Sequence, residues 1–178
     1  LMTHEADIAL LYRSEAVQID SQDDYLEIRE LGEERLVPVF ATDQLNRLEE
    51  ERARGGVPVI SYPPDVFLGQ LVNQEVFVRI GTQAFVRKKA ETALTLAAKQ
   101  LALAGVGIAW LPESLAGQEM TSGTLTNLDC VYPSPPMRVV AIRLPGEKSG
   151  AEDQVWSAIA ATSGSDVRRK RATVVPLA

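Results

Sequence analysis

A chain of 178 residues that is 46% hydrophobic and 24% charged has an ordinary globular composition, and it is long enough to bury one or two cores. Its net charge of −6 argues against binding a nucleic-acid backbone by this chain alone, because such binding needs a basic surface that displaces condensed counterions. Cys130 is the single cysteine, which excludes a disulfide framework within the chain and favours a reducing compartment.

The hydropathy pattern indicates neither export nor membrane insertion. Residues 1–7 lack the basic segment and apolar run of a secretory signal. The longest apolar run, residues 101–112, is shorter than the about 20 residues that cross a bilayer. We therefore expect a cytoplasmic protein.

The first part of the chain is typical of strands. Residues 7–12 form a short apolar run, which predicts a strand buried on both faces. Residues 26–31 alternate apolar and charged side chains, as an exposed strand does, and a turn at 32–35 is expected to follow. Residues 36–41 predict a further strand, in which Pro38 indicates an edge position or a bulge.

A helix and a second strand-to-helix unit come next. Residues 43–54 predict a solvated helix that ends at the glycine pair 55–56. Residues 57–62 predict a strand. Pro-Pro-Asp at 63–65 is a helix-start signal for a short helix over 66–73.

The middle of the chain predicts two more strands and one amphipathic helix. Residues 74–80 and 84–89 are strand candidates, and residues 92–104 predict a helix that stops at Gly105. Thr95, Lys99 and Gln100 are expected to face away from the core. The apolar stripe of this helix comprises Leu94, Ala97, Ala98, Leu101 and Ala104.

The last elements complete an alternation of strands and helices. Residues 106–111 predict a buried strand, 113–115 the start of a short helix, 137–144 a strand and 151–161 an amphipathic helix. The side chains expected to face inward on that last helix are Val155, Trp156 and Ile159. This alternation predicts an α/β fold.

Four segments resemble a known family in the order that the family has them. One segment spans residues 104–125, in which AGVGIAWLPESL at 104–115 and EMTSGTL at 119–125 resemble the AGxGIxxLP run and SGxL turn of LysR-type transcription regulators. Asp7-Ile8-Ala9-Leu10, Leu36-Val37-Pro38-Val39 and Val59-Ile60-Ser61-Tyr62-Pro63-Pro64 resemble three further segments of that family. The chain is therefore similar to the C-terminal effector-binding (substrate-binding) domain of these regulators.

The resemblance implies two Rossmann-like lobes with a cleft between them, as in periplasmic binding proteins of type 2. It places lobe I at 1–54 plus 146–178 and lobe II at 55–145. The winged helix-turn-helix of the family, and its first lobe I strand and helix, do not precede Leu1, so lobe I is expected to be partial. The family function implied is binding of a small, anionic effector, such as a carboxylate, that modulates DNA binding and transcription. DNA contact is expected only through the absent N-terminal domain, and a homodimer or tetramer is expected.

Ligands in such folds lie beyond the carboxyl ends of strands and at helix N-termini. Arg13 is the strongest candidate, because a guanidinium can hold a carboxylate through two hydrogen bonds; the alternative is a surface pair, for example with Glu15. Tyr62 equally fits packing of a turn, and Ser61 and Thr92 equally fit helix capping. The predicted ligand-binding residues are Tyr12, Arg13, Ser14, Ser61, Tyr62, Glu91, Thr92 and Val106.

No pattern predicts a catalytic site, a metal or a cofactor. His4 is the single histidine and has no metal-ligand spacing or nucleophile partner around it. Gly105-Val106-Gly107 lacks the third glycine of a dinucleotide fingerprint and follows a helix rather than a strand. Asp7, Glu91 and Glu113 have no spacing that forces two of them together. We therefore expect no enzyme.

Two alternatives stay open. A two-lobed solute-binding protein of transport, or a stand-alone small-molecule sensor, would share the architecture.

The basic run Arg168-Arg169-Lys170-Arg171 fits a solvated tail better than a DNA contact.

Overall fold

A computed structural model describes residues 6–17, 26–81, 84–146 and 149–162. His4 and the basic run at 168–171 lie outside the described residues. The chain divides into two compact units, which are described separately below. The first unit comprises Leu1–Leu11, Asp20–Glu33 and Arg138–Ala178, and the second comprises Tyr12–Ile19 and Glu34–Met137. The predicted lobe boundaries stay a prediction.

The first unit joins strands to one helix. It contains most of β1 (Ile8–Arg13) and β7 (Pro136–Arg143), the start of β2 (Glu27–Ala41), and helix α6 (Gly150–Thr162). In the sheet order β1-β7-β2-β5, β1 lies at one end. The strand predicted at 7–12 is present, but its burial on both faces is wrong, because none of its residues is fully buried and Leu10 is 63% exposed.

A buried arginine holds α6 in the first unit. The guanidinium of Arg143 donates hydrogen bonds to Glu27 (2.7 Å) and to Asp153 (2.8 Å), and it lies 4.7 Å from the ring centroid of Trp156. Arg29 lies at the same distance from that ring and donates to the Trp156 carbonyl oxygen. Trp156 faces inward as predicted, whereas Val155 is 52% exposed and was wrongly expected to be buried.

Strand β2 continues without interruption through the turn expected at 32–35. Gly32 does not adopt a positive φ, and the residues around it are partly exposed, so the polar pattern reflects an exposed strand rather than a turn. The second half of β2 is buried and pairs antiparallel with β5 (Ala109–Pro112) through Leu36↔Pro112 to Val39↔Ala109. The end of β2 pairs with β6 (Leu125–Asn127).

The expectation of an edge or a bulge at Pro38 is also wrong. The register with β5 passes unbroken through Pro38↔Trp110. Leu128 donates its backbone N–H to the Pro38 carbonyl oxygen (2.9 Å) from a loop. The backbone nitrogen and carbonyl of one residue point to the same side of a strand. The nitrogen of Pro38, which carries no hydrogen, therefore faces that loop and not β5, so no hydrogen bond to β5 is lost.

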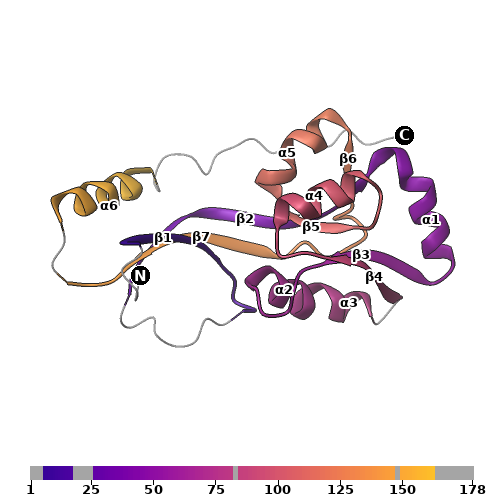
Figure 1. Cartoon of the computed structure of the whole chain (residues 1–178), viewed down its shortest axis with the longest axis horizontal. Helices are drawn as coiled ribbons and strands as arrows, with labels where there is room; N and C mark the ends of the chain where they lie inside the picture. The colour runs from indigo at the N-terminus through magenta and orange to yellow at the C-terminus, as the bar shows by residue number, and fades with distance from the viewer. Residues whose placement is uncertain (1–5, 18–25, 82–83, 147–148, 163–178) are drawn as a thin grey trace. The chain divides into compact units, whose positions relative to one another are not determined.

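The second unit also holds a parallel strand pair (Figure 1). Strands β3 (Gly56–Ser61) and β4 (Phe85–Glu91) pair in parallel, and Val59 forms a parallel bridge to Ile108. The helical elements of this unit are η2 (Thr42–Gln44), α1 (Leu45–Ala53), α2 (Phe67–Leu71), the π-helical η3 (Val72–Phe77), α3 (Val78–Ile80), α4 (Thr95–Leu103) and α5 (Glu113–Ser122).

Residues 74–80 are helical, so the strand predicted there is wrong. Val72, Val76 and Ile80 are at most 5% exposed and are spaced four residues apart, which is the spacing of one helix face. Helix α2 therefore continues through η3 and α3 instead of giving way to a strand.

The helix predicted at 92–104 is present as α4 (Thr95–Leu103), and the centre of its predicted apolar stripe is buried or partly buried, but the two ends of the stripe are not. Ala98 and Ala102 are fully buried, whereas Leu94 is 70% exposed because α4 begins after it. Ala104 is also exposed, and Lys99, expected to face away, is half-buried. Gly105 adopts φ +67° after the helix, which confirms it as the stop.

Candidate functional site

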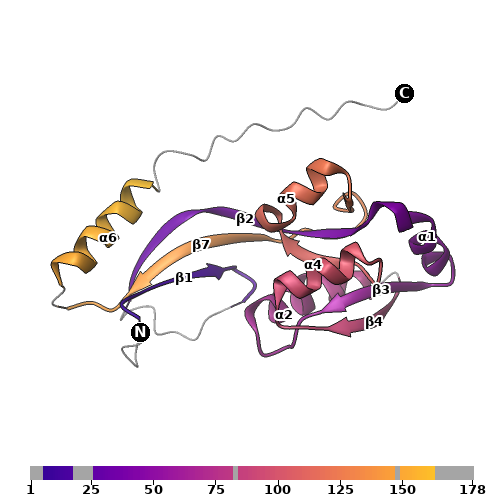
Figure 2. The ribbon, with the colours of Figure 1, turned by 45° about the horizontal axis from the view of Figure 1, so that its top comes forward.

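The carboxyl ends of β3 and β4 bring four of the predicted residues together. Ser61 and Glu91 are direct partners in the parallel register, although 30 residues separate them in sequence. Thr92 extends this pairing by donating its N–H to the Ser61 carbonyl oxygen (3.0 Å). Ser61, Tyr62, Glu91 and Thr92 therefore share one edge of the strand pair in the second unit. Figure 2 shows the arrowheads of β3 and β4 on the same side of this pair.

Ser61 and Glu91 form the polar centre of this edge. The hydroxyl of Ser61 is 3.3 Å from both the Ala90 carbonyl oxygen and Glu91 Oε2, and Ser61 is buried. The ammonium group of Lys88 donates a hydrogen bond to the same Glu91 oxygen (2.5 Å). The hydrogen bonds from Lys88 and Ser61 lower the pKa of Glu91, so its carboxylate is charged at neutral pH and accepts hydrogen bonds.

Tyr62 and Thr92 have defined local partners. The buried hydroxyl of Tyr62 donates to the carbonyl oxygen of Trp110 (2.9 Å), and burial raises the pKa of this phenol. The Thr92 hydroxyl accepts the backbone N–H of Leu94 (3.1 Å), which is a turn-type contact just before α4. Both side chains therefore hold the backbone that frames the site.

The end of β1 and the segment that follows it belong to the same unit. Tyr12, Arg13 and Ser14 lead into Val17, which is buried in the core of the second unit. The Ser14 hydroxyl accepts the N–H of Ala16, and burial together with the charge of Glu34 raises the pKa of Tyr12. Figures 1 and 2 both show this segment running beside α2, the helix that follows Tyr62.

Val106 is not brought to the other predicted residues. It precedes Ile108, which pairs in parallel with Val59, so Val106 lies toward the opposite, amino-terminal end of β3. Lys88, in contrast, was not predicted although it contacts Glu91. The sequence feature that could have indicated Lys88 is the basic run Arg87-Lys88-Lys89, in which Lys88 stands three residues before Glu91 at the end of a strand.

The residues that the structure describes contain no group of three or more His, Cys, Asp or Glu side chains placed to hold a metal ion. None of the helices that the structure describes is long and apolar enough to span a membrane.

The chain has an α/β fold of the periplasmic-binding-protein type, in which ligands bind beyond the carboxyl ends of strands. Residues 1–163 match the family model described as the LysR substrate binding domain, and the chain belongs to this family. The predicted fold class and the resemblance to LysR-type regulators are thereby confirmed.

The curated relatives are transcription regulators of Escherichia coli. The chain is 30% identical over 126 residues to the HTH-type transcriptional regulator YjiE of strain K12, covering 71% of this chain and 41% of that protein. It is 29% identical over 126 residues to the HTH domain-truncated transcriptional regulator QseD of O157:H7, covering 71% of this chain and 51% of that protein. The aligned part thus spans about half or less of these relatives.

The solved structures most relevant here are of HypT from Salmonella typhimurium. Its apo regulatory domain superposes with a TM-score of 0.75 at 25% identity, covering 93% of this chain and 76% of that one. Its bromide-bound form gives a TM-score of 0.74 at 25% identity, with the same coverages. The full-length protein, described as a hypochlorite-specific LysR-type transcriptional regulator, gives 0.74 at 24% identity and covers 93% of this chain and 54% of that one.

Proposed function

We propose that this chain senses a small carboxylate effector at the edge formed by Ser61, Tyr62, Glu91 and Thr92. The observation that carries the proposal is the parallel register that pairs Ser61 with Glu91 at the carboxyl ends of two strands. That position is where open α/β sheets bind ligands. Arg13, in the same unit, is the proposed anchor for the effector carboxylate.

The charge of Glu91 narrows the class of effector. Its carboxylate is kept ionised by Lys88 and Ser61, so it repels a bare anion and accepts hydrogen bonds from a donor. We therefore infer an effector that carries a hydroxyl or amino group beside its carboxylate. Arg13 would bind the carboxylate, and Glu91 would accept the neighbouring donor.

Titration calorimetry with matched small acids tests this assignment. Propionate, lactate and alanine form an aliphatic set, and benzoate and salicylate form an aromatic pair, so each set varies the donor. We expect binding only for members with a donor, and at least tenfold weaker binding in Arg13→Ala. Arg54→Ala, which removes an exposed arginine at the end of α1, serves as the matched control.

Two results would overturn parts of the proposal. If Arg13→Ala binds as tightly as the natural chain, Arg13 is not the anchor. If propionate and benzoate bind as well as their hydroxylated partners, Glu91 does not select a donor.

The regulatory role rests on family membership and on the relatives named as transcription regulators. We propose that effector binding favours one conformation of the domain and so alters how a DNA-binding domain outside these residues engages its operator. An effector can do so only by binding one conformation more tightly than the other. We expect this to occur in the cytoplasm, with the effector released chemically unchanged. No observation favours a transport protein or an enzyme over this role.

We further propose self-association into a homodimer or tetramer. Leu94 and Leu96 are 70% and 62% exposed beside the start of α4, which is unusual for two neighbouring leucines. Light scattering after size exclusion should give twice or four times the chain mass. A monomer at all concentrations would refute this part.

A further inference from the structure

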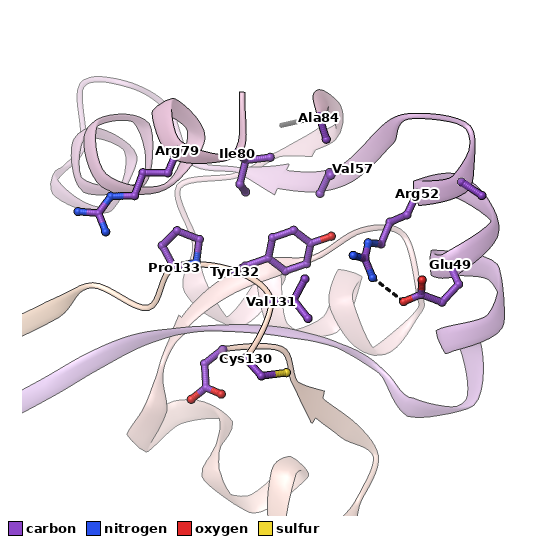
Figure 3. A pocket seen from close by; sticks show the side chains of 12 residues that line it. Glu49, Arg52, Val57, Arg79, Ile80, Ala84, Cys130, Val131, Tyr132 and Pro133 are labelled. Carbon is purple, nitrogen blue, oxygen red and sulfur yellow. Dashed lines mark hydrogen bonds and ion pairs between the residues drawn. The ribbon is translucent and has the colours of Figure 1, made fainter. Parts of the chain in front are cut away.

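A pocket lies in the second unit, at the end of β3 opposite Ser61 (Figure 3). It is a pocket of about 750 Å³ that borders Val57 at the start of β3. Helix α1, helix α3 and the loop that contains Tyr132 supply most of the remaining wall. The pocket is therefore separate from the proposed effector site, and no residue predicted to bind the effector lines it.

Tyr132 places an unsatisfied polar group at this pocket. Tyr132 is only 7% exposed, and its hydroxyl has no hydrogen-bond partner among the described residues. Figure 3 shows the hydroxyl directed toward the side of the pocket where Val57 and Arg52 lie. Burial of such a group without a partner is costly, so it favours any occupant that supplies one.

The pocket wall combines an apolar side with balanced charges. Val57, Ile80 and Ala84 form part of the apolar side. The four charged residues of the lining, two acids and two arginines, cancel in sum; they are Glu49, Asp129, Arg52 and Arg79. A lining of zero net charge gives no preference for an anion, in contrast to an arginine anchor, and it suits a neutral molecule.

Arg52 lies beside the aromatic ring of Tyr132 and is paired with Glu49. Its guanidinium lies 5.8 Å from the Tyr132 ring centroid and 2.7 Å from Glu49. The side chains of Arg52 and Glu49 are 35% and 65% exposed, and such exposed pairs contribute little to stability. An occupant that reaches the Tyr132 ring can therefore displace this ion pair at little cost.

We propose that this pocket is a second binding site, for a small neutral molecule that contains a ring and a carbonyl group. The ring packs on the apolar wall, and the hydroxyl of Tyr132 donates a hydrogen bond to the carbonyl oxygen. The chemistry differs from that of the proposed carboxylate effector, and the two sites can be occupied at the same time.

Benzamide, acetophenone and benzoate are suitable probes, because they share one ring and differ in charge. In two-dimensional amide NMR titrations we expect benzamide and acetophenone to shift the signals of Ala84, Val131 and Tyr132, and benzoate to shift them at least tenfold less readily. Tyr132→Phe should weaken benzamide binding at least tenfold. Ser61→Ala, at the other site, should leave benzamide binding unchanged.

Cys130 provides an independent readout, since it is the single cysteine of the chain, lines the pocket and is exposed. Saturating benzamide should slow its reaction with a colorimetric disulfide reagent several-fold, and it should not do so in Tyr132→Phe. The proposal is overturned if neither neutral probe binds saturably, if Tyr132→Phe binds benzamide as tightly as the natural chain, or if benzoate competes equally. None of these outcomes depends on whether the carboxylate effector site exists.

Discussion

Two buried tyrosines of the second unit differ in one contact. Tyr62 donates its hydroxyl to the Trp110 carbonyl oxygen, whereas the Tyr132 hydroxyl has no hydrogen-bond partner among the described residues. We expect Tyr62→Phe to lower the free energy of unfolding by about 1–2 kcal/mol, because it deprives a buried carbonyl of this donor. Tyr132→Phe should not lower it and should raise it by up to about 1–2 kcal/mol, since it removes a buried hydroxyl that has no partner among the described residues.

Urea denaturation followed by circular dichroism measures both changes. The two variants make the same chemical alteration at residues that are 3% and 7% exposed, so each is the control for the other. Equal losses would show that the Tyr62 hydrogen bond contributes nothing specific.

The contact between Lys99 and Glu119 makes the stability of the fold depend on pH. Lys99 donates a hydrogen bond to Glu119 Oε1 (2.7 Å), and this bond is the main cause of a Glu119 pKa below 4.5. A carboxyl group whose pKa is lower in the folded state stabilises the fold above its unfolded pKa, and this contribution is lost as the pH falls through the lower, folded value. The stabilisation is therefore complete at neutral pH and disappears in acid.

Thermal unfolding at about pH 5 and about pH 3 tests this sign. Glu119→Gln should show a smaller drop in melting temperature between the two values than the natural chain. Lys99→Met should flatten the dependence in the same way, because it removes the charge that lowers the Glu119 pKa. An unchanged drop in both variants would contradict the assignment.

At the scale of elements, one close approach fixes helix α2 against the turn that follows the effector site. A Cβ atom on Gly69 would lie 1.8 Å from the Pro63 carbonyl oxygen, a separation that only movement of the backbone can relieve. We expect Gly69→Ala to cost about 1–3 kcal/mol of unfolding free energy, as overpacking of a tight contact does.

Gly117→Ala is the matched control. Gly117 lies inside α5, and a Cβ atom there would meet nothing within 4 Å. This change should stabilise the chain by about 0.5–1 kcal/mol, because alanine is the better helix residue. If both alanine variants behave alike, the contact with Pro63 does not constrain α2.

At the scale of the whole molecule, the two units differ in their cores. Among the described residues, the buried hydrophobic side chains of the first unit are Val140, Ala141 and Trp156, whereas the second unit buries a large cluster around Trp110. Since buried apolar area is the main favourable term in folding, we expect the first unit to unfold at a lower urea concentration.

Each unit contains one of the two tryptophans in the chain, so each carries its own probe. Fluorine NMR of the chain labelled with 5-fluorotryptophan should show two resonances, assigned with Trp156→Phe. The Trp156 resonance should convert to its unfolded position before that of Trp110. Coincident transitions would show that the two units unfold as one cooperative system.

The candidate site was predictable in part. Ser61 and Tyr62 were predicted because they end a strand, and Glu91 and Thr92 because they begin a helix; both rules need only a local pattern. Lys88 was missed, and Val106 was placed with them, because the contacts of both depend on how strands align rather than on their own sequence surroundings.

Local properties of the chain were decided by the sequence itself. The strand at 36–41, the glycine stop at Gly105 and the α/β alternation follow from side-chain periodicity and from the backbone conformations that glycine alone adopts easily. The ordered motifs were enough to identify the LysR family.

The tertiary structure decided what depends on neighbours. The apolar pattern of residues 74–80 fits either a strand or a helix. The helix forms because it buries Val72, Val76 and Ile80 on one face against the core. The core likewise selects Ala98 over Leu94 for burial in α4. The pairing of Ser61 with Glu91 is set by the register between two strands, and that register depends on long-range packing that no short stretch of sequence contains.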